Sequence, residues 1–414
     1  MRVKFFVILL SLVLSNSVIF GGGFQVNEHG ARVTSMGGAF VGLANDASAL
    51  YFNPAGITQL RGFNAMLGTT LIFPSTSFRG PSPGVDETKM VKQMFYPSHL
   101  YLTYAINDKL HAGVGMNNPF GLGTKWDDDY FGRFVALETV LRTYSFYPTV
   151  AYQVLDNLSL SASLVYTAAT VKIRRNAAVG SLAEAEILLE GSAKPTFGYN
   201  FGMLWKPFNA LSVGVTYRSS ADYEFEGTAT AKSEQSQVLG LLPSGDIVAK
   251  FKQPNQLVFG LAYQATNNLT VTSDFQYIGW SSYDSLKVDF VNPAFSDLAS
   301  PKEYKNTYII RFGAEYQYSN DLSLRCGLLY DNNPTPDERL DPSLPDSDRL
   351  GLTLGAGYQV TQNLNVGLSY MFLRFSERKI TDSKVNYSGT GYAPLNGVYN
   401  STANLFGFSF SYNF

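Results

Sequence analysis

Cysteine, histidine and charge are all scarce in this chain of 414 residues. Its one cysteine, Cys326, excludes a disulfide within the chain. Charged residues make up 15% of the chain, whereas ordinary soluble domains hold about 25%. The 31 Lys and Arg nearly balance the 33 Asp and Glu, so the sequence offers no strongly basic face for nucleic acid. A surface that is poor in charge instead suits contact with lipid.

The three histidines, His29, His99 and His111, give little scope for catalysis. An enzyme would need a nucleophile with a base within reach. The strands predicted below place His99 and His111 at opposite ends of two neighbouring strands, roughly 20 Å apart at about 3.4 Å per residue. Cys326 falls in a lipid-facing phase and is expected to be a small apolar residue rather than a metal ligand. We therefore expect no enzyme, no metal and no cofactor.

Long apolar runs are missing beyond the first residues. Residues 1–22 hold a basic start, an apolar run over 5–14 and small residues at Ser15 and Ser17, which predicts a secretory signal peptide. Cleavage is expected between residues 17 and 23. After it, no window reaches the roughly 18 unbroken apolar residues that a membrane-spanning helix needs. An exported chain without such a helix can still cross a membrane as a closed β-barrel, whose backbone groups are all paired.

Alternating aromatic segments and tight turns support a barrel. The chain holds 26 Tyr and 30 Phe, and its 37 Gly suit a sheet that bends sharply. About every fifty residues, an alternating run ends in a short polar turn and a second run starts with Leu. These turns lie at 107–109, 156–157, 208–210, 267–268, 320–321 and 362–363. A soluble β-solenoid or propeller of similar period is the alternative, but the runs are too long and the other connections too irregular for stacked repeats.

Long polar connections alternate with these turns, which separates the two ends of the barrel. They cover 79–95, 117–142, 174–195, 224–253, 285–306, 332–349 and 377–404. Outer-membrane barrels have short turns in the periplasm and long loops outside. The strands from Phe63–Phe73 to Leu405–Phe414 number fourteen, so residues 61–414 are predicted to form one antiparallel transmembrane β-barrel with both chain ends in the periplasm. We expect a monomer in the outer membrane of a Gram-negative-type bacterium.

The phase of each strand assigns its side chains to the lipid or to the lumen. An Arg on the lipid face would cost about 2 to 4 kcal/mol at the bilayer midplane. The polar phase must therefore face the lumen, which predicts four lumenal polar side chains: Arg218, Arg311, Glu315 and Arg325. Register through the turn at 320–321 puts Glu315 opposite Arg325 as a cross-strand ion pair. Each arginine could brace the barrel in this way or bind a ligand carboxylate.

The last strand ends in a pattern that outer-membrane assembly usually recognises. Phe406, Phe408, Phe410, Tyr412 and Phe414 alternate on the predicted lipid face. An aromatic C-terminal residue that closes such a strand is the usual signal for the assembly machinery. The expected partners of the wall are therefore this machinery, outer-membrane lipid and lipopolysaccharide.

Residues 23–60 differ from everything that follows them. They are rich in Gly and Ala, carry no sustained helical or strand period, and end in Asn53-Pro54-Ala55 before alternation begins. Such a segment cannot build a core of its own, so it has to pack inside something else. The sequence predicts an N-terminal hatch that plugs the lumen of the barrel.

This hatch resembles that of the long-chain fatty acid outer-membrane transporter family (FadL/TodX, OMPP1). Within the hatch, the similarity is carried by Gly23-Phe24-Gln25, Gly37-Gly38-Ala39-Phe40, Ala44-Asn45-Asp46-Ala47-Ser48 and Asn53-Pro54-Ala55. Further along, it is carried by Asn118-Pro119-Phe120-Gly121-Leu122, Trp126 and Gly132-Arg133. The resemblance implies passive transport of hydrophobic compounds, either long-chain fatty acids or aromatic hydrocarbons. It also implies capture among the outer loops, gating by the hatch, and exit through a side opening at a kink in the third strand.

Residues at two places agree with those steps. Asn118, Pro119, Phe120 and Gly121 mark the expected kink, because Pro119 lacks a ladder donor; a bulge at the barrel rim is the alternative. In the loops, residues 181–191 are predicted to form a short helix. Apolar side chains there and in the next loop are expected either to grip a ligand or to pack together. They are Leu182, Leu188, Leu189, Val238, Leu239, Leu241 and Leu242.

A general diffusion porin is the alternative function. A porin would have an open polar lumen and no plug, so it would pass large steady ion currents. The sequence leaves open whether the ligand is a fatty acid or an uncharged hydrocarbon, since the family's lumenal ligand contacts do not match this chain residue by residue.

Overall fold

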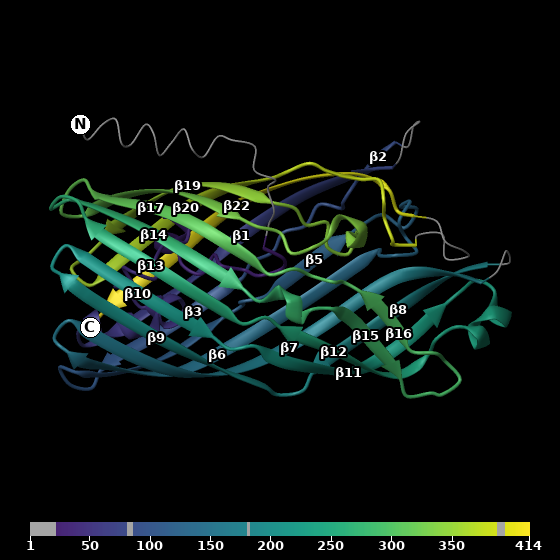
Figure 1. Ribbon diagram of the computed structural model, residues 1–414, viewed down its shortest axis with the longest axis horizontal. Helices are drawn as coiled ribbons and strands as arrows, with labels where there is room; N and C mark the ends of the chain where they lie inside the picture. Colours follow the sequence, from purple (N-terminus) through teal and green to yellow (C-terminus); the bar gives the residue numbers. More distant parts are fainter. Residues whose placement is uncertain (1–21, 81–85, 180–182, 387–393) are drawn as a thin grey trace.

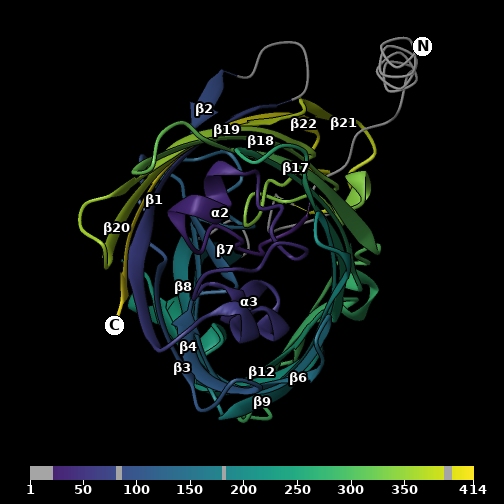
Figure 2. The same ribbon diagram turned by 90° about the vertical axis from the view of Figure 1, so that its left-hand side faces the viewer.

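Fourteen antiparallel strands form the wall of a closed barrel, which confirms the predicted fold (Figure 1, Figure 2). The computed structural model describes residues 22–80, 86–179, 183–386 and 394–414. In chain order the wall strands are β1 (Phe63–Arg79), β3 (Ser98–Ala105), β4 (Leu110–Asn117), β6 (Glu138–Leu155), β7 (Leu158–Val179), β9 (Thr196–Phe208), β10 (Leu211–Arg218), β13 (Gln256–Gln264), β14 (Leu269–Ile278), β17 (Thr307–Gln317), β18 (Leu322–Asp331), β19 (Arg349–Gln359), β20 (Leu364–Phe375) and β22 (Gly397–Asn413). Closure is direct, because β1 pairs with β3 on one side and with β22 on the other.

Tight turns join the wall strands at the end where the chain terminates, and all six predicted turns are confirmed. The turn between β3 and β4 shows why Asn is favoured there. The Asn107 side-chain oxygen accepts hydrogen bonds from the backbone N–H of Lys109 (2.9 Å) and Leu110 (2.8 Å). The side chain thus replaces the backbone partners that a two-strand reversal leaves unsatisfied.

The long connections at the other end contain further short elements, several of which continue the wall (Figure 1). Those described are β2 (Glu87–Lys89), β5 (Gly121–Lys125), β8 (Ala183–Ala193), β11 (Ala221–Lys232), β12 (Gly245–Gln253), β15 (Ser285–Phe290), β16 (Leu298–Pro301), β21 (Arg378–Ile380) and the 3₁₀ helices η3 (Ser236–Leu241), η4 (Trp280–Ser282) and η5 (Asp337–Arg339). Strands β8, β11, β12 and β15 pair in series beyond β7, so the sheet extends past the barrel.

Three expectations about these connections are wrong. The first wall strand runs to Arg79 rather than Phe73, and the last begins at Gly397 rather than Leu405. The predicted helix over 181–191 is instead the strand β8, which pairs with both β7 and β11. Backbone hydrogen bonds to the strands on both sides, together with burial of every second apolar side chain, outweigh helix propensity there. Leu182 and residues 1–21 of the predicted signal peptide lie outside the described residues.

The two faces of the wall follow the predicted phases. Leu324 and Leu328 are 43% and 40% exposed on the outside of β18, whereas Arg325 is 7% exposed. In the last strand, Phe406 and Phe410 are exposed on the same outer face. These exposures confirm that the apolar phase faces outward and the polar phase faces the lumen.

The lumen holds the start of the described chain, residues 22–60, which we call the inner segment. Figure 2 looks into the barrel from the tight-turn end and shows α2 and α3 inside the ring of strands. The inner segment contains α2 (Ala31–Ser35), α3 (Ala49–Phe52) and the 3₁₀ helix η2 (Pro54–Gln59). Its apolar side chains form a core with inward-facing wall residues. Helices of the described residues are all too short or too polar to cross a membrane.

Inward-facing glycines let the wall touch the inner segment directly. The Cβ atom of any other residue at these positions would collide with the inner segment, in most cases with its backbone. The six positions, which we call the glycine seat, are Gly202, Gly214, Gly260, Gly313, Gly327 and Gly355. Two pairs lie side by side on neighbouring strands, Gly214 with Gly260 and Gly313 with Gly327. The high glycine content was expected to serve bending, but here it serves close approach of two backbones.

Candidate functional site

A cavity of about 760 Å³ lies between the start of the inner segment and the wall. Its lining includes lumen-facing side chains such as Ile309 and Leu329, and also Met116, Tyr96 and Tyr144, which are exposed on the outside of the wall. Side chains from the lumenal face and from the outer face of the wall both line this cavity. The cavity therefore lies at the wall, beside side chains that face the lumen and side chains that are exposed outside.

A break in the third wall strand lies at this cavity. Strand β4 ends at Asn117 opposite Ser145, and β5 resumes at Gly121 opposite Arg142. Three residues, 118–120, thus oppose two on β6, which is the geometry of a bulge. Pro119 donates no ladder hydrogen bond there. The predicted kink residues therefore lie at the break, and the bulge that was the alternative is how the break is made.

Side-chain hydrogen bonds hold the broken strand in place. Asn118 Nδ2 donates to the backbone oxygen of Thr143 (2.7 Å), and Asn118 Oδ1 accepts from the backbone N–H of Ser98 (2.9 Å). The Thr143 hydroxyl donates to the backbone oxygen of Phe120 (2.6 Å) and accepts from its N–H (3.1 Å). These contacts replace the missing ladder bonds, so the break is a defined structure.

The start of the inner segment covers the break from inside. The N–H of Gly121 donates to the backbone oxygen of Phe24 (3.1 Å), and the N–H of Val26 donates to that of Pro119 (2.9 Å). Gln25 and Phe120 are bridge partners in this short antiparallel contact. Residues 23–28, which we call the N-strand, therefore lie along the free edge of the break.

Aromatic rings pack around the N-strand. The Phe24 ring lies 4.8 Å from that of Trp280 and 5.4 Å from that of Phe251, measured between centroids. Phe120 and Tyr283 complete this group, which we call the aromatic cluster. The cluster gives the N-strand an apolar contact at the lumen side of the cavity.

The other side of the cavity is charged. Glu28, Asp331 and Asp346 line it together with Arg311 and Arg349. Burial raises the pKa of the Glu28 carboxyl above its ordinary value, against the opposing effect of Arg349. Burial likewise raises the pKa of Asp346, which lies in the loop before β19, to about 6. Carboxylates therefore outnumber arginines on this lining.

Two of the predicted lumenal arginines hold neighbouring residues rather than standing free. Arg218 donates to the backbone oxygen of Tyr51 (2.5 Å) and to Gln256 Oε1 (2.9 Å), and its guanidinium lies 4.3 Å from the centre of the Tyr51 ring. Arg311 donates to Gln276 Oε1 (2.7 Å) and also lines the cavity. The four predicted side chains do not form one site: Arg311 reaches the cavity, and Arg218 fixes the inner segment.

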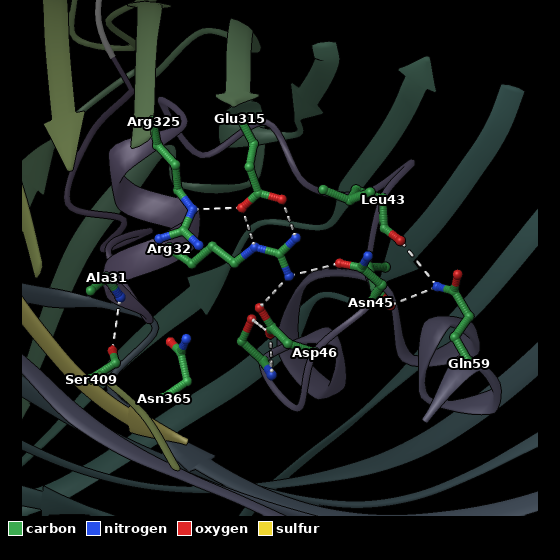
Figure 3. Close-up of polar contacts among 12 residues, drawn as sticks. Ala31, Arg32, Leu43, Asn45, Asp46, Gln59, Glu315, Arg325, Asn365 and Ser409 are labelled. Carbon is green, nitrogen blue, oxygen red and sulfur yellow. Dashed lines mark hydrogen bonds and ion pairs between the residues drawn. The ribbon is translucent and has the colours of Figure 1, made fainter. Parts of the chain in front are cut away.

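The predicted ion pair between Glu315 and Arg325 is present, with Nε 2.6 Å from Oε2. A residue that the sequence reading missed completes it (Figure 3). Arg32 of α2 binds both Glu315 oxygens, at 2.7 and 2.8 Å, and also reaches Asn45 (2.8 Å) and Asp46 (3.2 Å). The pair therefore anchors the inner segment to the wall. Alternation along the strands could predict only the two wall residues of this group. Arg32 lies in a segment without a helical or strand pattern, so its partner could not be predicted.

The Asn53-Pro54-Ala55 motif has a structural role in the inner segment. Asn53 Nδ2 donates to the backbone oxygens of Val41 and Met203, both at 2.9 Å. Its Oδ1 accepts from the N–H of Ala55 (3.3 Å) and so caps η2, while Pro54 takes the first helical position. One side chain thus ties two parts of the inner segment to β9.

The predicted capture residues separate into three groups. Leu189, Val238 and Leu242 are buried in one apolar cluster, with Leu239 packed against it. Leu241 is 70% exposed. Leu188 lies on the opposite face of β8, beside Arg174 and Glu186. The structure therefore brings four of the described six together.

These features define a class of protein: a β-barrel whose lumen holds the inner segment, with a cavity between this segment and the wall at a strand break. The chain belongs to the outer membrane protein transport protein family (OMPP1/FadL/TodX), whose model matches residues 12–414. It is 26% identical to outer membrane protein P1 of Haemophilus influenzae, over 98% of this chain and 99% of that protein. It is 24% identical to the long-chain fatty acid transport protein of Escherichia coli K12, over 94% and 96% of the two chains.

Solved structures agree on the fold. A Pseudomonas aeruginosa FadL homologue superposes with a TM-score of 0.86 at 20% identity, covering 95% of this chain and all of that one. The toluene transporter TodX of Pseudomonas putida gives 0.75 at 20% identity, covering 94% and 99%. Family membership confirms the predicted location in the outer membrane, and it places the chain among transport proteins rather than enzymes.

Proposed function

We propose that this protein is a passive transporter of hydrophobic compounds, in which the inner segment is a hatch and the ligand leaves sideways through the wall. The position of the cavity carries this proposal: it lies at the strand break, and the N-strand covers it. An apolar solute gains about 0.8 kcal/mol per CH₂ group on leaving water. Exit into lipid is therefore favoured over exit into the aqueous periplasm.

Connected apolar clusters support a path from the outer loops to the cavity. The outermost cluster holds Leu189, Val238 and Leu242, the predicted capture residues. Ala249 joins it to a middle cluster around Tyr223, Phe225 and Ala221. Leu141 and Phe251 join that middle cluster to the aromatic cluster beside the N-strand. A ligand that is captured among the loops would thus meet apolar side chains along the whole path.

The charges on the cavity lining favour an uncharged ligand. A fatty acid carboxylate needs an unmatched cation or several donors where it binds. Here Arg349 is paired with Asp331 at 2.9 Å and Arg311 donates to Gln276. The whole lining holds four carboxylates, Glu28, Glu138, Asp331 and Asp346, against three arginines, Arg142, Arg311 and Arg349. We propose that aromatic or aliphatic hydrocarbons and alcohols enter this cavity more readily than carboxylates do.

Uptake into outer-membrane vesicles tests the transport proposal. Vesicles from a host without its own carrier, with and without this protein, would be given radiolabelled toluene, 1-dodecanol or dodecanoate. We expect faster entry of toluene and dodecanol when the protein is present, and little gain for dodecanoate. Equal rates with and without the protein, for all three, would reject the transporter. The substitution Leu241→Asp is expected to slow capture, since Leu241 is the exposed member of the predicted group.

Ion conductance separates the transporter from a porin. In planar bilayers we expect the purified protein to pass little steady current, because the inner segment fills the lumen. Large steady currents, together with entry of a hydrophilic sugar at the rate of the apolar compounds, would favour the porin.

A further inference from the structure

Three buried carboxylates surround the first described residues. The backbone N–H of Gly23 donates to Asp346 Oδ2 at 2.8 Å. A side chain on Gly22 would collide with the carboxylate of Asp331, so Asp331 lies directly against Gly22. Asp348 is close enough to Asp346 and Asp331 for their charges to raise its pKa further. All three side chains are at least nine-tenths buried, with exposures of 6% for Asp331, 3% for Asp346 and 1% for Asp348.

Nearby arginines leave two oxygens of these carboxylates without a partner. Arg349 pairs with Asp331 Oδ2 at 2.9 Å, Arg311 also acts on Asp331, and Arg378 acts on Asp348. Among the described residues, Asp331 Oδ1 and Asp348 Oδ2 nevertheless accept no hydrogen bond. Burial and the neighbouring carboxylates raise the pKa of Asp348 to about 8, against the opposing effects of Arg378 and Arg349. A metal ion does not fit, because no three acidic or His side chains of the described chain are arranged to hold one.

We propose that this acidic pocket binds the α-ammonium group of the mature chain, which the cell creates by cutting the Gly21–Gly22 bond. In that hydrolysis the oxygen of water joins the carbonyl carbon of Gly21, the C–N bond breaks, and the nitrogen of Gly22 ends as –NH₃⁺. The enzyme is a signal peptidase, for which Gly21 is the small residue directly before the bond and Ile19 stands at the third position before it. The new ammonium forms beside the unpaired oxygen of Asp331. A larger residue at position 22 would have to displace the Asp331 carboxylate.

The consequence concerns closure of the wall. The N-strand begins at Gly23, whose carbonyl accepts from Arg349 Nη2 at 3.2 Å. An ammonium on Gly22 anchors this end to Asp331 and to the loop that carries Asp346. An uncut precursor has no charge at that position. We infer that removal of the signal peptide adds a charged anchor to an N-strand that already lies across the strand break.

Two measurements test the proposal on protein purified from outer membranes. Intact mass and N-terminal sequencing are expected to give Gly22 as the first residue. A start at Val18, after the Ser15-Asn16-Ser17 site, would overturn the proposal. Next, ¹³C-methylation of the α-amino group allows its titration by NMR. We expect it to titrate at least one pH unit above the ordinary range of about 7.7 to 8.0, and titration within that range would also overturn the proposal.

Variants connect this titration to the pocket. Asp331→Asn is expected to bring the titration of the α-amino group down toward its ordinary range. Asp289→Asn, at an exposed position on β15, is the matched control and is expected to change nothing. The wild-type titration decides by itself if Asp331→Asn fails to assemble.

Discussion

The wall holds the two parts of the inner segment in opposite ways. Residues 31–60 lie with their backbone against the glycine seat and are tied by Arg32 and Asn53. The N-strand, residues 23–28, is held by a few hydrogen bonds and aromatic contacts, and it borders a cavity. A close-packed backbone cannot shift without collisions, whereas a strand beside empty space can. The part that moves during transport is therefore expected to be the N-strand.

The largest effect is expected from Arg32→Met. It leaves Asp46 and one side of Glu315 without a cation in a mostly buried site. Breaking such a buried pair costs about 3 to 5 kcal/mol, and we expect the lower end because Glu315 keeps Arg325. Urea unfolding of the purified protein measures the loss. The matched control is Arg61→Met, whose pair with Asp108 is exposed and worth at most about 1 kcal/mol; equal losses for the two would contradict this anchor.

The second largest effect is expected when a glycine of the glycine seat is replaced by a larger residue. Gly214→Val places a Cβ against the backbone oxygen of Val41, and overpacking of this kind costs about 1 to 3 kcal/mol. The displaced inner segment should also increase ion current in planar bilayers. Gly240→Val is the control, because nothing lies within 4 Å of a Cβ at that loop position. An unchanged current for Gly214→Val would show that the seat does not hold the plug.

A substitution in the N-strand is expected to change the rate of uptake rather than the stability of the protein. Val26→Pro removes the N–H that donates to Pro119. One hydrogen bond is worth about 0.5 to 1.5 kcal/mol, which corresponds to a roughly two- to tenfold faster uptake of apolar ligand if opening here limits the rate. Val26→Ala keeps the N–H and serves as the control. Slower uptake by Val26→Pro, with Val26→Ala unchanged, would argue that this contact assists transport.

The most local effect concerns the loop that holds Gly23. Lys302 Nζ lies 2.6 Å from Asp341 Oδ2 in this loop region. Burial alone would raise the pKa of Asp341, but Lys302 outweighs it and holds the pKa below its ordinary value of 3.8. The stability from this pair is therefore present above about pH 4 and is lost as the pH falls through the lowered pKa. We expect proteolysis of the loop to increase below pH 4 in the wild type, and already at pH 7 in Lys302→Met.

The strands of the wall could be predicted from the sequence because apolar and polar residues alternate regularly along them. Alternation fixes which residues face lipid, and the tight turns fix register, so Glu315 could be placed opposite Arg325. The helix predicted over 181–191 failed because the same apolar residues satisfy a strand once β7 and β11 lie on both sides.

The inner segment and the cavity could be predicted only in outline. Arg32, the glycine seat and the N-strand contacts depend on how an aperiodic segment lies against inward-facing residues of many strands. No local pattern encodes those pairings. Pro119 marked the strand break, but nothing in its neighbourhood indicated that Phe24 and Val26 would cover it.

Disulfide locks test most directly whether the N-strand moves while the rest of the inner segment stays. In a Cys326→Ala background, cysteines at Gln25 and Phe120 join the N-strand to the break, where these residues are bridge partners. Cysteines at Ala31 and Gly367 join α2 to β20, where the two Cβ positions are 3.3 Å apart, close to disulfide geometry. We predict that the first lock abolishes uptake of apolar ligand until a reductant is added, and that the second leaves uptake unchanged. Uptake through the first lock, or a block by the second, would contradict the account.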